Sequence, residues 1–437
     1  MKILLTSDHH PGSINGVIVS VMNLKMELEK KGEDVRLLTL SPTKESYIED
    51  KVYYIGSLPF NIYPDIRATF RSNHPLVKEL IDWKPDIIHS QCEFFTYTFV
   101  KRIAAKCHIP IIHTYHTMYE HYMRYIMPIG DGSGLVAPIM RSRLKTADVI
   151  IAPTGKVRDS LAKGRVADNI RVIPTGIDLR KFDRRISEER RAEILSSLNI
   201  PRTARVFGSV GRLAEEKNYS EVLQVMKSLT ESRPDLYLVL TGDGAFKEGL
   251  EKETEKLGLT DRVRFPGMIP ADLIYEYYQI LEFFVSASVS ETQGLTYIEA
   301  LSNGLPVIAR RDGAIDRVVI SGENGFQYDQ PEELKTRIEK LLDSPELKAK
   351  LEEGAMASRQ QFGTEIFGDR VHNLYKEVLN RDVRPKHERT ALTHKLAESI
   401  RKRTADSDIG TAFDSIQSKR SRWAFEKNRQ DQNKPAE

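Results

Sequence analysis

Short apolar runs alternate with helix-like segments along residues 1–180, and this alternation constrains the fold more than any other feature of the sequence. The runs are rich in Ile, Leu and Val and lack an apolar–polar alternation, which is typical of parallel strands buried on both faces. They are KILLTS, DVRLLTL, DIIHS, IPIIHT and DVIIAP. The segment between the first two carries Val17, Val21 and Leu24 at helical spacing. Because strand, helix and parallel strand form the unit of a doubly wound sheet, the pattern predicts a Rossmann-like domain.

The same alternation restarts after residue 200, so we expect a second domain of the same kind. The second series of runs is RVFGSVGR, LYLVLTGDG, RVRFPGMI, EFFVSAS and LPVIARR. We therefore predict an α/β architecture in which two Rossmann-like domains, residues 1–180 and 200–364, face each other across a cleft. The helical segment 365–380 is expected to cross back to the first domain, and residues 381–437 to form a basic tail. The 437 residues suffice for two domains of ordinary size.

The net charge of +3 is spread unevenly along the chain. Residues 1–180 hold 24 Lys and Arg against 19 Asp and Glu, a balance of +5. Residues 181–379 have a balance of −7, with 27 cationic and 34 acidic residues, and residues 380–437 one of +5, with 14 and 9. The basic ends are thus candidates for contact with an anionic surface. No nucleic-acid-binding module accompanies this charge, so we do not expect a nucleic acid partner.

Cysteine content and hydropathy indicate a cytoplasmic protein. Cys92 and Cys107 are the only two cysteines, which excludes a disulfide framework and a multi-cysteine zinc site. No uninterrupted apolar stretch reaches the roughly 18 residues that a membrane-spanning helix needs. The opening residues MKILLTSDHH are expected to form a first buried strand and not a signal peptide.

The C-terminal tail permits two interpretations. TALTHKLAESIRKR has the pattern of a short amphipathic helix, and SKRSRWAFEKNR surrounds Trp423 and Phe425 with five cations. The simpler interpretation is a solvated polar tail. The alternative is an interfacial anchor with aromatic residues at headgroup depth and cations on anionic lipid.

Two strand ends carry residues suited to phosphate groups. The loop SDHHPGSING leads from the first run into a helix, and Gly12 and Gly16 flank its turn. Backbone amides at a helix start attract phosphate, and glycine permits its close approach. Arg212 and Lys217 follow the first strand of the second domain, where open α/β sheets bind ligands. They could hold a diphosphate, the arginine by a bidentate fork and the lysine as a point charge, or be surface cations neutralised by adjacent glutamates.

The segment 290–308, SETQGLTYIEALSNGLPVI, carries the most specific pattern. Glu291 and Glu299 are eight residues apart, a little over two helical turns, so we expect them on one helix face. We expect Gly294 and Leu295 in the first turns of that helix, whose unpaired amides can donate to a phosphate. Without its neighbours the glutamate pair would be an ordinary solvated face. Its place between two strands favours a ligand site instead.

Two histidines, His113 and His116, are expected just past the strand 109–113 of the first domain, facing the solvent near the cleft. A single histidine in such a place is more often structural than catalytic. Together with Glu120 the pair could ligate a metal ion. The sequence shows no further ligand cluster near the cleft, so we predict no metal site.

In combination, these segments resemble the retaining glycosyltransferases of family 4, which have the GT-B fold. The resemblance covers about residues 1–380 and rests on SINGV, HTYHT, GRLAEEKN, TGDG, FPGMIP and the two glutamates with seven residues between them. The stretch HTYHTMYEHYMRYI is similar to the lipid-modifying branch, whose members move glucose from UDP-glucose to diacylglycerol. Two positions depart from the family pattern: Asn15 stands where many members have glycine, and Ala245 stands where proline often follows TGDG.

The resemblance implies roles for individual residues. The residues implied to hold the donor diphosphate are Gly16, Arg212, Lys217, Gly294 and Leu295. Glu299 is implied to bind the ribose hydroxyls, and the backbone around Met268 is implied to meet the uracil. His116 and Glu291 are implied to contact the transferred sugar as the catalytic residues, with His116 near its 6-hydroxyl.

The implied acceptor, diacylglycerol, stays in the bilayer, so the enzyme is expected to work peripherally at the cytoplasmic face of the cell membrane. Two first-domain segments mix apolar and basic residues: 60–83, with Arg67 and Arg71, and 123–145. The cations of the second segment expected to meet anionic lipids are Arg141, Arg143 and Lys145. The alternative for each segment is an ordinary core helix with a cationic outer face.

The resemblance therefore implies a retaining glucosyltransferase that uses UDP-glucose and the 3-hydroxyl of 1,2-diacylglycerol. Its product would be α-monoglucosyldiacylglycerol, a glycolipid that serves as a lipoteichoic-acid anchor. No cofactor and no metal ion are expected. Two alternatives stay open: a family 4 transferase with another sugar donor or a soluble saccharide acceptor, and a nucleotide-sugar-binding scaffold without catalytic activity.

Overall fold

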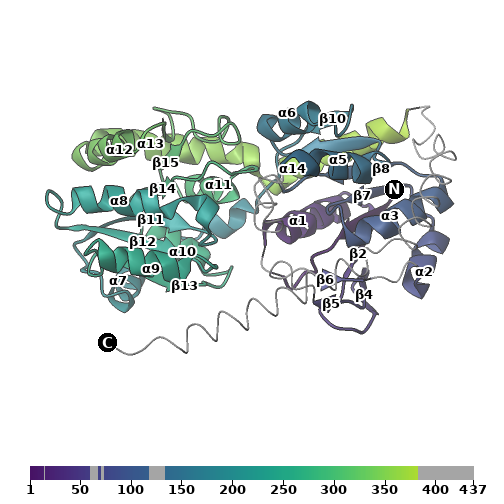
Figure 1. The fold of residues 1–437 in the computed structure, drawn as a ribbon, viewed down its shortest axis with the longest axis horizontal. Helices are drawn as coiled ribbons and strands as arrows, with labels where there is room; N and C mark the ends of the chain where they lie inside the picture. Colours follow the sequence, from purple (N-terminus) through teal and green to yellow (C-terminus); the bar gives the residue numbers. More distant parts are fainter. Residues whose placement is uncertain (14, 60–66, 70–72, 118–132, 382–437) are drawn as a thin grey trace, which may run out of the picture. The chain divides into compact units, whose positions relative to one another are not determined.

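The structure of the chain, a computed structural model, describes residues 1–13, 15–59, 67–69, 73–117 and 133–381 (Figure 1). The chain divides into two compact units, Met1–Val383 and Arg384–Glu437, and the features below belong to the first unit. Of the features discussed above, the following lie outside the described residues: Arg71, Glu120, the end of HTYHTMYEHYMRYI from residue 118, the parts 60–66 and 123–132 of the two mixed segments, and residues 382–437 of the tail.

The first domain is built on a sheet of eight strands in the order β10-β9-β8-β7-β1-β2-β4-β3. All neighbours run parallel except the pair of β3 and β4, which is antiparallel. The strands are β1 (Lys2–Ser7), β2 (Asp34–Leu40), β3 (Tyr47–Glu49), β4 (Val52–Ile55), β7 (Ile87–Ser90), β8 (Ile111–Thr114), β9 (Val149–Ala152) and β10 (Ile170–Val172). A separate small hairpin pairs β5 (Leu58–Pro59) with β6 (Arg67–Ala68). The five apolar runs of the first series correspond to β1, β2, β7, β8 and β9.

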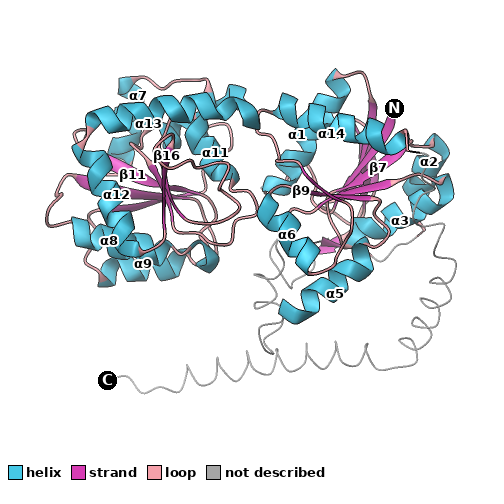
Figure 2. Cartoon of the chain, turned by 90° about the horizontal axis from the view of Figure 1, so that it is seen from above, coloured by secondary structure: helices cyan, strands magenta, loops and turns pink. Residues whose placement is uncertain are grey.

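Helices cover both faces of this sheet (Figure 2). One face packs against α2 (Pro75–Trp83), α3 (Phe95–Cys107), α5 (Ser133–Leu144) and α6 (Gly155–Lys163). The other face packs against α1 (Gly16–Lys30) and α14 (Thr364–Leu379). The helix α14 follows the second sheet in sequence and nevertheless contributes Phe367, Val371 and Tyr375 to the core of the first domain. The segment 365–380 therefore packs on the first domain.

The second domain is built on six parallel strands in the order β13-β12-β11-β14-β15-β16. They are β11 (Arg205–Val210), β12 (Leu236–Thr241), β13 (Val263–Gly267), β14 (Phe284–Ser286), β15 (Val307–Arg310) and β16 (Gly325–Tyr328). The apolar core on one face includes side chains of α8 (Tyr219–Leu229), α9 (Lys247–Lys256) and α12 (Pro331–Asp343). The other face carries α7 (Glu188–Ser197), α10 (Ile274–Gln279) and α11 (Leu295–Ser302), and α13 (Pro345–Ser358) contributes to both cores. Short 3-10 turns lie at η1 (Leu179–Phe182), η2 (Glu215–Lys217) and η3 (Arg359–Phe362).

Two parallel sheets, each with helices on both faces, confirm the predicted doubly wound α/β architecture. The strand order of the second sheet reverses between β11 and β14, because the chain adds β12 and β13 on one side and β15 and β16 on the other. Ligands of such sheets bind beyond the carboxyl ends of the strands at this reversal. Of the helices in the described part of the chain, none is both long enough and apolar enough to cross a bilayer.

Candidate active site

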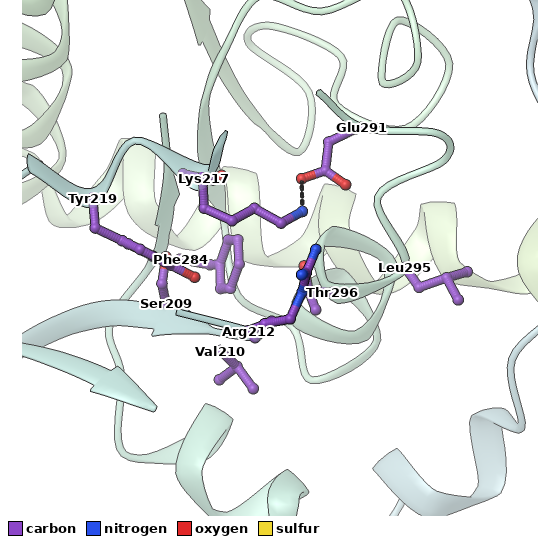
Figure 3. A pocket seen from close by; sticks show the side chains of 11 residues that line it. Ser209, Val210, Arg212, Lys217, Tyr219, Phe284, Glu291, Leu295 and Thr296 are labelled. Carbon is purple, nitrogen blue, oxygen red and sulfur yellow. Dashed lines mark hydrogen bonds and ion pairs between the residues drawn. The ribbon is translucent and has the colours of Figure 1, made fainter. Parts of the chain in front are cut away.

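A pocket of about 200 Å³ lies where β11 and β14 end, at the reversal of the second sheet (Figure 3). Its lining residues come from the ends of both strands, the loops that follow them and the starts of α8 and α11. They are Ser209, Val210, Gly211, Arg212, Lys217, Tyr219, Phe284, Ser286, Glu291, Leu295 and Thr296. The pocket thus brings together four residues singled out from the sequence, namely Arg212, Lys217, Glu291 and Leu295.

The centre of the pocket is an ion pair between Lys217 and Glu291. The Lys217 Nζ donates to Glu291 Oε1 at 2.6 Å, and the two side chains are 23% and 10% exposed (Figure 3). Burial acts to raise the pKa of Glu291, but the charge and hydrogen bond of Lys217, with help from Ser288, bring it below its ordinary value. The Tyr297 hydroxyl donates to Ser286 Oγ at 2.7 Å and lies 3.5 Å from Glu291 Oε1. Glu291 is therefore an ionised carboxylate at neutral pH.

Arg212 lies in the loop that follows β11, and glycines allow this loop to pack closely against the TGDG segment after β12. Its Nη2 donates to Glu216 Oε1 at 2.6 Å, and 43% of its side chain is exposed. A Cβ on Gly242, in the TGDG segment, would lie 1.8 Å from the Gly211 carbonyl oxygen. Only glycine permits this approach, so TGDG packs against the loop that carries Arg212.

The helix α11 begins at Leu295, which corrects the expectation that both glutamates share a helix face. Gly294 precedes the helix with a φ of 73°, a left-handed conformation that ends the regular periodicity. Glu291 consequently lies in the loop before α11, whereas Glu299 lies within the helix. A Cβ on Gly294 would lie 2.6 Å from Tyr297 Cδ2, so glycine is also required by packing.

Hydrogen bonds to the first domain fix the loop that carries Glu291. The Gln293 amide accepts from the Thr175 backbone amide and donates to the Thr175 carbonyl, both at 2.8 Å. The Thr154 hydroxyl donates to the Thr292 carbonyl at 2.9 Å. The Lys156 Nζ donates to the Glu291 carbonyl at 3.2 Å, and it also pairs with a buried aspartate at 2.6 Å. These contacts hold the backbone between Glu291 and α11 in one position.

Glu299 is half-buried and has the opposite electrostatic environment. Its Oε2 accepts from the Tyr278 hydroxyl at 2.7 Å. Burial raises the pKa of Glu299, and the Tyr278 hydrogen bond and the Lys181 charge offset only part of this effect. Glu299 does not line the pocket described above, and neither does Met268, which follows β13 and is 55% exposed.

In the first domain, His116 follows β8 and hydrogen-bonds to Gln91. The His116 Nε2 lies 2.7 Å from Gln91 Oε1. Burial, and then the nearby His113 and His9, lower the pKa of His116 to about 3, so the imidazole is neutral. The expectation that His113 faces the solvent is wrong, because β8 continues through it and its side chain is fully buried 3.1 Å from Glu93.

Gly16 is the first residue of α1, which Asn15 caps by accepting a hydrogen bond from the Ile18 amide at 3.1 Å. A Cβ on Gly16 would lie 3.3 Å from Leu295 Cδ1. The start of α1 therefore lies beside the start of α11, and a larger residue would crowd this contact. Within the described ranges, no group of three or more His, Cys, Asp or Glu side chains is placed to hold a metal ion.

The basic residues predicted at the membrane differ in their surroundings. Arg67 is half-buried and donates to the Ser41 carbonyl and to Ser57 at 2.7 Å. Arg141 donates to the carbonyls of two residues that follow α6, at 2.7 and 3.0 Å. Arg143 is half-buried and Lys145 is exposed. Arg67 and Arg141 thus have intramolecular hydrogen bonds that the sequence did not predict.

The sequence did not predict the residues that orient the site: Gln91, Lys156, Tyr278, Gln293 and Tyr297. Four of them contact a predicted site residue directly, and Gln293 holds the loop of Glu291 through Thr175. Single glutamines, lysines and tyrosines have no spacing signature. The one available signal was position, since Gln91 directly follows an apolar run and Gln293 precedes a glycine at a helix start.

Comparisons with known proteins agree with this architecture. The family model described as Glycosyltransferase Family 4 matches residues 14–181, and the model described as Glycosyl transferases group 1 matches residues 190–357. An α-monoglucosyldiacylglycerol synthase of Streptococcus pneumoniae is 34% identical over 383 residues, which are 87% of this chain and 86% of the relative. A synthase of the same name from Acholeplasma laidlawii is 27% identical over 395 residues, 87% of this chain and 98% of the relative.

Among solved structures, the complex of Anabaena HepE with UDP-glucose aligns with a TM-score of 0.68. It covers 86% of this chain and 100% of HepE at 17% sequence identity, and at that identity the likeness supports the fold alone. The two family models together match strands of both sheets, and the Streptococcus pneumoniae relative aligns along most of the chain. The chain therefore belongs to the family 4 glycosyltransferases, with the GT-B fold.

Proposed function

We propose that the chain transfers glucose from UDP-glucose to the 3-hydroxyl of 1,2-diacylglycerol and forms α-monoglucosyldiacylglycerol with retention of configuration. Two relatives that align along most of the chain carry the name α-monoglucosyldiacylglycerol synthase, which supports this substrate class. The product belongs to the membrane glycolipids that anchor lipoteichoic acid. A basic, apolar surface of the first domain would bring the enzyme to its lipid acceptor.

The observation that carries the proposal is the pocket at the reversal of the second sheet, where Arg212 and Lys217 lie beside Glu291 and the start of α11. When the bond between the anomeric carbon and UDP breaks, negative charge develops on the departing diphosphate. Two cations and the unpaired amides of a helix start can stabilise this charge. An ionised Glu291 can accept hydrogen bonds from sugar hydroxyls at the same time.

We assign the transfer to attack on the front face of the sugar. Retaining hydrolases use a carboxylate nucleophile on the opposite face. Among the described residues that line the pocket, Glu291 is the one carboxylate, and Lys217 already holds its Oε1. The lipid hydroxyl oxygen would bond to the anomeric carbon while the UDP oxygen leaves and accepts the hydroxyl proton. A trapped covalent glucosyl–enzyme intermediate would contradict this mechanism.

The decisive experiment supplies UDP-glucose and UDP-galactose separately with diacylglycerol in phosphatidylglycerol vesicles and identifies the glycolipid by mass spectrometry. We expect a monoglucosyl product from UDP-glucose, and its loss in Glu291→Gln with UDP binding retained. Activity only on soluble saccharides without vesicles would favour the alternative acceptor. UDP binding without turnover of any donor would favour the inactive scaffold.

Membrane association is tested by vesicle pelleting. Each cation near an anionic leaflet contributes about 1 kcal/mol of binding. Since Arg141 has intramolecular partners, we propose Arg143→Ser with Lys145→Ser as the test. The matched control replaces Lys227 and Lys252 on helices of the second domain. Pelleting with phosphatidylglycerol vesicles should fall only in the first variant, and equal pelleting would remove α5 from the membrane surface.

A further inference from the structure

The pair of Gln91 and His116 lies at the carboxyl edge of the first sheet. Gln91 directly follows β7, and His116 lies two residues beyond β8. The two strands are parallel neighbours in the sheet. The Gln91 backbone amide donates to the Thr6 carbonyl at 2.9 Å, and this bond anchors the residue to β1 as well. Gln91 is therefore fixed between three strands and is only 2% exposed.

The contact between the two side chains determines which imidazole nitrogen carries the proton. The Gln91 atom that faces His116 is the amide oxygen Oε1, at 2.7 Å from Nε2. An amide oxygen only accepts, so with the amide in this orientation Nε2 carries the proton and donates it. In a neutral imidazole the other nitrogen, Nδ1, then has a lone pair and can only accept.

A polar network holds the ends of β7 and β8 in place beneath this pair. His89 of β7 hydrogen-bonds through Nε2 to Thr114 Oγ1 of β8 at 2.7 Å. Its Nδ1 lies 2.6 Å from the Tyr375 hydroxyl of α14. Both ring nitrogens of His89 are thus used within the protein. The residues that continue each strand, Gln91 and His116, are held in a fixed register by these bonds.

The nitrogen of the Gln91 side-chain amide, Nε2, is a buried donor. Among the described residues, no hydrogen-bond acceptor lies within reach of Gln91 Nε2. Leaving a buried amide without a partner costs stability, so native proteins seldom retain such a group without a function. The Gln91 donor and the accepting Nδ1 belong to two side chains that are in contact, and they are complementary in character. A ligand with several hydroxyl groups can satisfy both.

We propose that Gln91 is a positioning residue that holds His116 in its Nε2–H tautomer, so that Nδ1 accepts from a hydroxyl of the transferred hexose and the Gln91 amide donates to another of its oxygens. The identity of the ligand rests on the proposed function and on the implied place of His116 near the 6-hydroxyl. The tautomer does not depend on either. A hexose suits the pair better than diacylglycerol, which has a single hydroxyl group.

The tautomer is measured without substrate. The full chain carrying 15N-labelled histidine is studied by long-range 15N–1H correlation, and the loss of signals in His116→Asn identifies His116. We expect the Nε2–H tautomer in the unmodified chain and in Gln91→Glu, whose carboxylate also accepts from Nε2. We expect a mixture of tautomers in Gln91→Met. A Nδ1–H tautomer in the unmodified chain would overturn the proposal even if no Gln91 variant folds.

The hydroxyl contact is measured as the ratio of kcat/KM for UDP-glucose to that for its 6-deoxy analogue. A neutral hydrogen bond contributes a factor of about three to ten, so this ratio should fall by that amount in Gln91→Met. The matched control is Gln327→Met, which removes another buried glutamine, in β16, and should leave the ratio and the His116 tautomer unchanged.

The possible outcomes separate this proposal from the proposed function. If the ratio of kcat/KM falls in Gln91→Met, the hydroxyl that His116 contacts belongs to the donor sugar. An unchanged ratio with an unchanged tautomer in folded Gln91→Met refutes the positioning role. If the unmodified chain transfers no hexose at all, the proposed function fails, and the tautomer measurement alone decides whether Gln91 positions His116.

Discussion

Replacing Lys217 with methionine removes the partner of a carboxylate that the fold has buried. Glu291 would keep its negative charge in a pocket where its side chain is 10% exposed, with the Tyr297 hydroxyl 3.5 Å away. Losing one partner of a buried ion pair costs about 3–5 kcal/mol, because the remaining charge is uncompensated. Lys217 itself is 23% exposed, so water screens part of the interaction. We therefore expect Lys217→Met to lower the free energy of unfolding by about 3 kcal/mol at neutral pH.

The loss should depend on pH in a defined direction. In the unmodified chain the pKa of Glu291 is depressed, so its contribution to stability is present above its unfolded value and is lost as the pH falls through the folded pKa. Without Lys217, burial raises this pKa instead, and ionisation then costs stability. The difference in the free energy of unfolding between the unmodified chain and Lys217→Met should consequently be largest at pH 7 to 8 and shrink toward pH 4. Urea denaturation followed by circular dichroism at both pH values measures it.

Two comparisons test the reasoning. Adding Glu291→Gln to Lys217→Met should restore most of the lost stability, since no uncompensated charge remains. The control Lys252→Met breaks a pair with Glu248 that has the same 2.6 Å separation but side chains 72% and 79% exposed, and its stability should be unchanged. A double variant as unstable as Lys217→Met, or a control as unstable, would refute the assignment of the cost to a buried charge.

Three further substitutions probe the start of α11 and its surroundings. Gly294→Ala places a Cβ at a φ of 73° and 2.6 Å from Tyr297, so both the thermal midpoint and the affinity for UDP by calorimetry should fall. Glu299→Gln keeps an acceptor for Tyr278 and removes a carboxylate whose pKa burial raises, so it should stabilise the fold at pH 8, progressively less toward pH 4, and weaken UDP binding. Arg212→Lys loses the guanidinium fork and should weaken UDP binding roughly tenfold, with little change in stability.

The sequence predicts most of the buried strands but not all of them, since β4 and β16 are buried along their whole length and belong to neither series of runs. Most runs of the two series are apolar because their strands pack between two helical layers, whereas β13 lies at the edge of its sheet and is only partly buried. The missed strand β3 is exposed along its whole length, so burial imposed no apolar pattern on it. Its antiparallel pairing with β4 is a local hairpin whose two-residue turn, Asp50 and Lys51, contains no glycine that would mark it in the sequence.

The start of α11 shows the same limit within the site. The spacing of Glu291 and Glu299 fits a continuous helix, and nothing in the periodicity distinguishes a helix that begins at Leu295. The left-handed conformation of Gly294 prevents the helix from extending back to Glu291. A glycine in the sequence permits this conformation but does not require it. The loop before Gly294 is held by Gln293 and Thr175, which are 118 residues apart, so no local pattern predicts the contact.

The opposite environments of the two glutamates follow from this helix start. If Glu291 lay on α11 with Glu299, helical spacing would place both carboxylates on one face, about 12 Å apart along the axis. Because Gly294 turns the chain, Glu291 instead meets Lys217 and is ionised. Glu299 accepts from the neutral hydroxyl of Tyr278, and its pKa is raised because this bond and the Lys181 charge offset only part of the effect of burial. The two carboxyl groups therefore suit different partners. The ionised Glu291 suits the hydroxyls of a sugar beside a diphosphate, and Glu299, which is costly to ionise, suits a neutral diol. One glycine conformation thereby assigns different chemistry to two identical side chains.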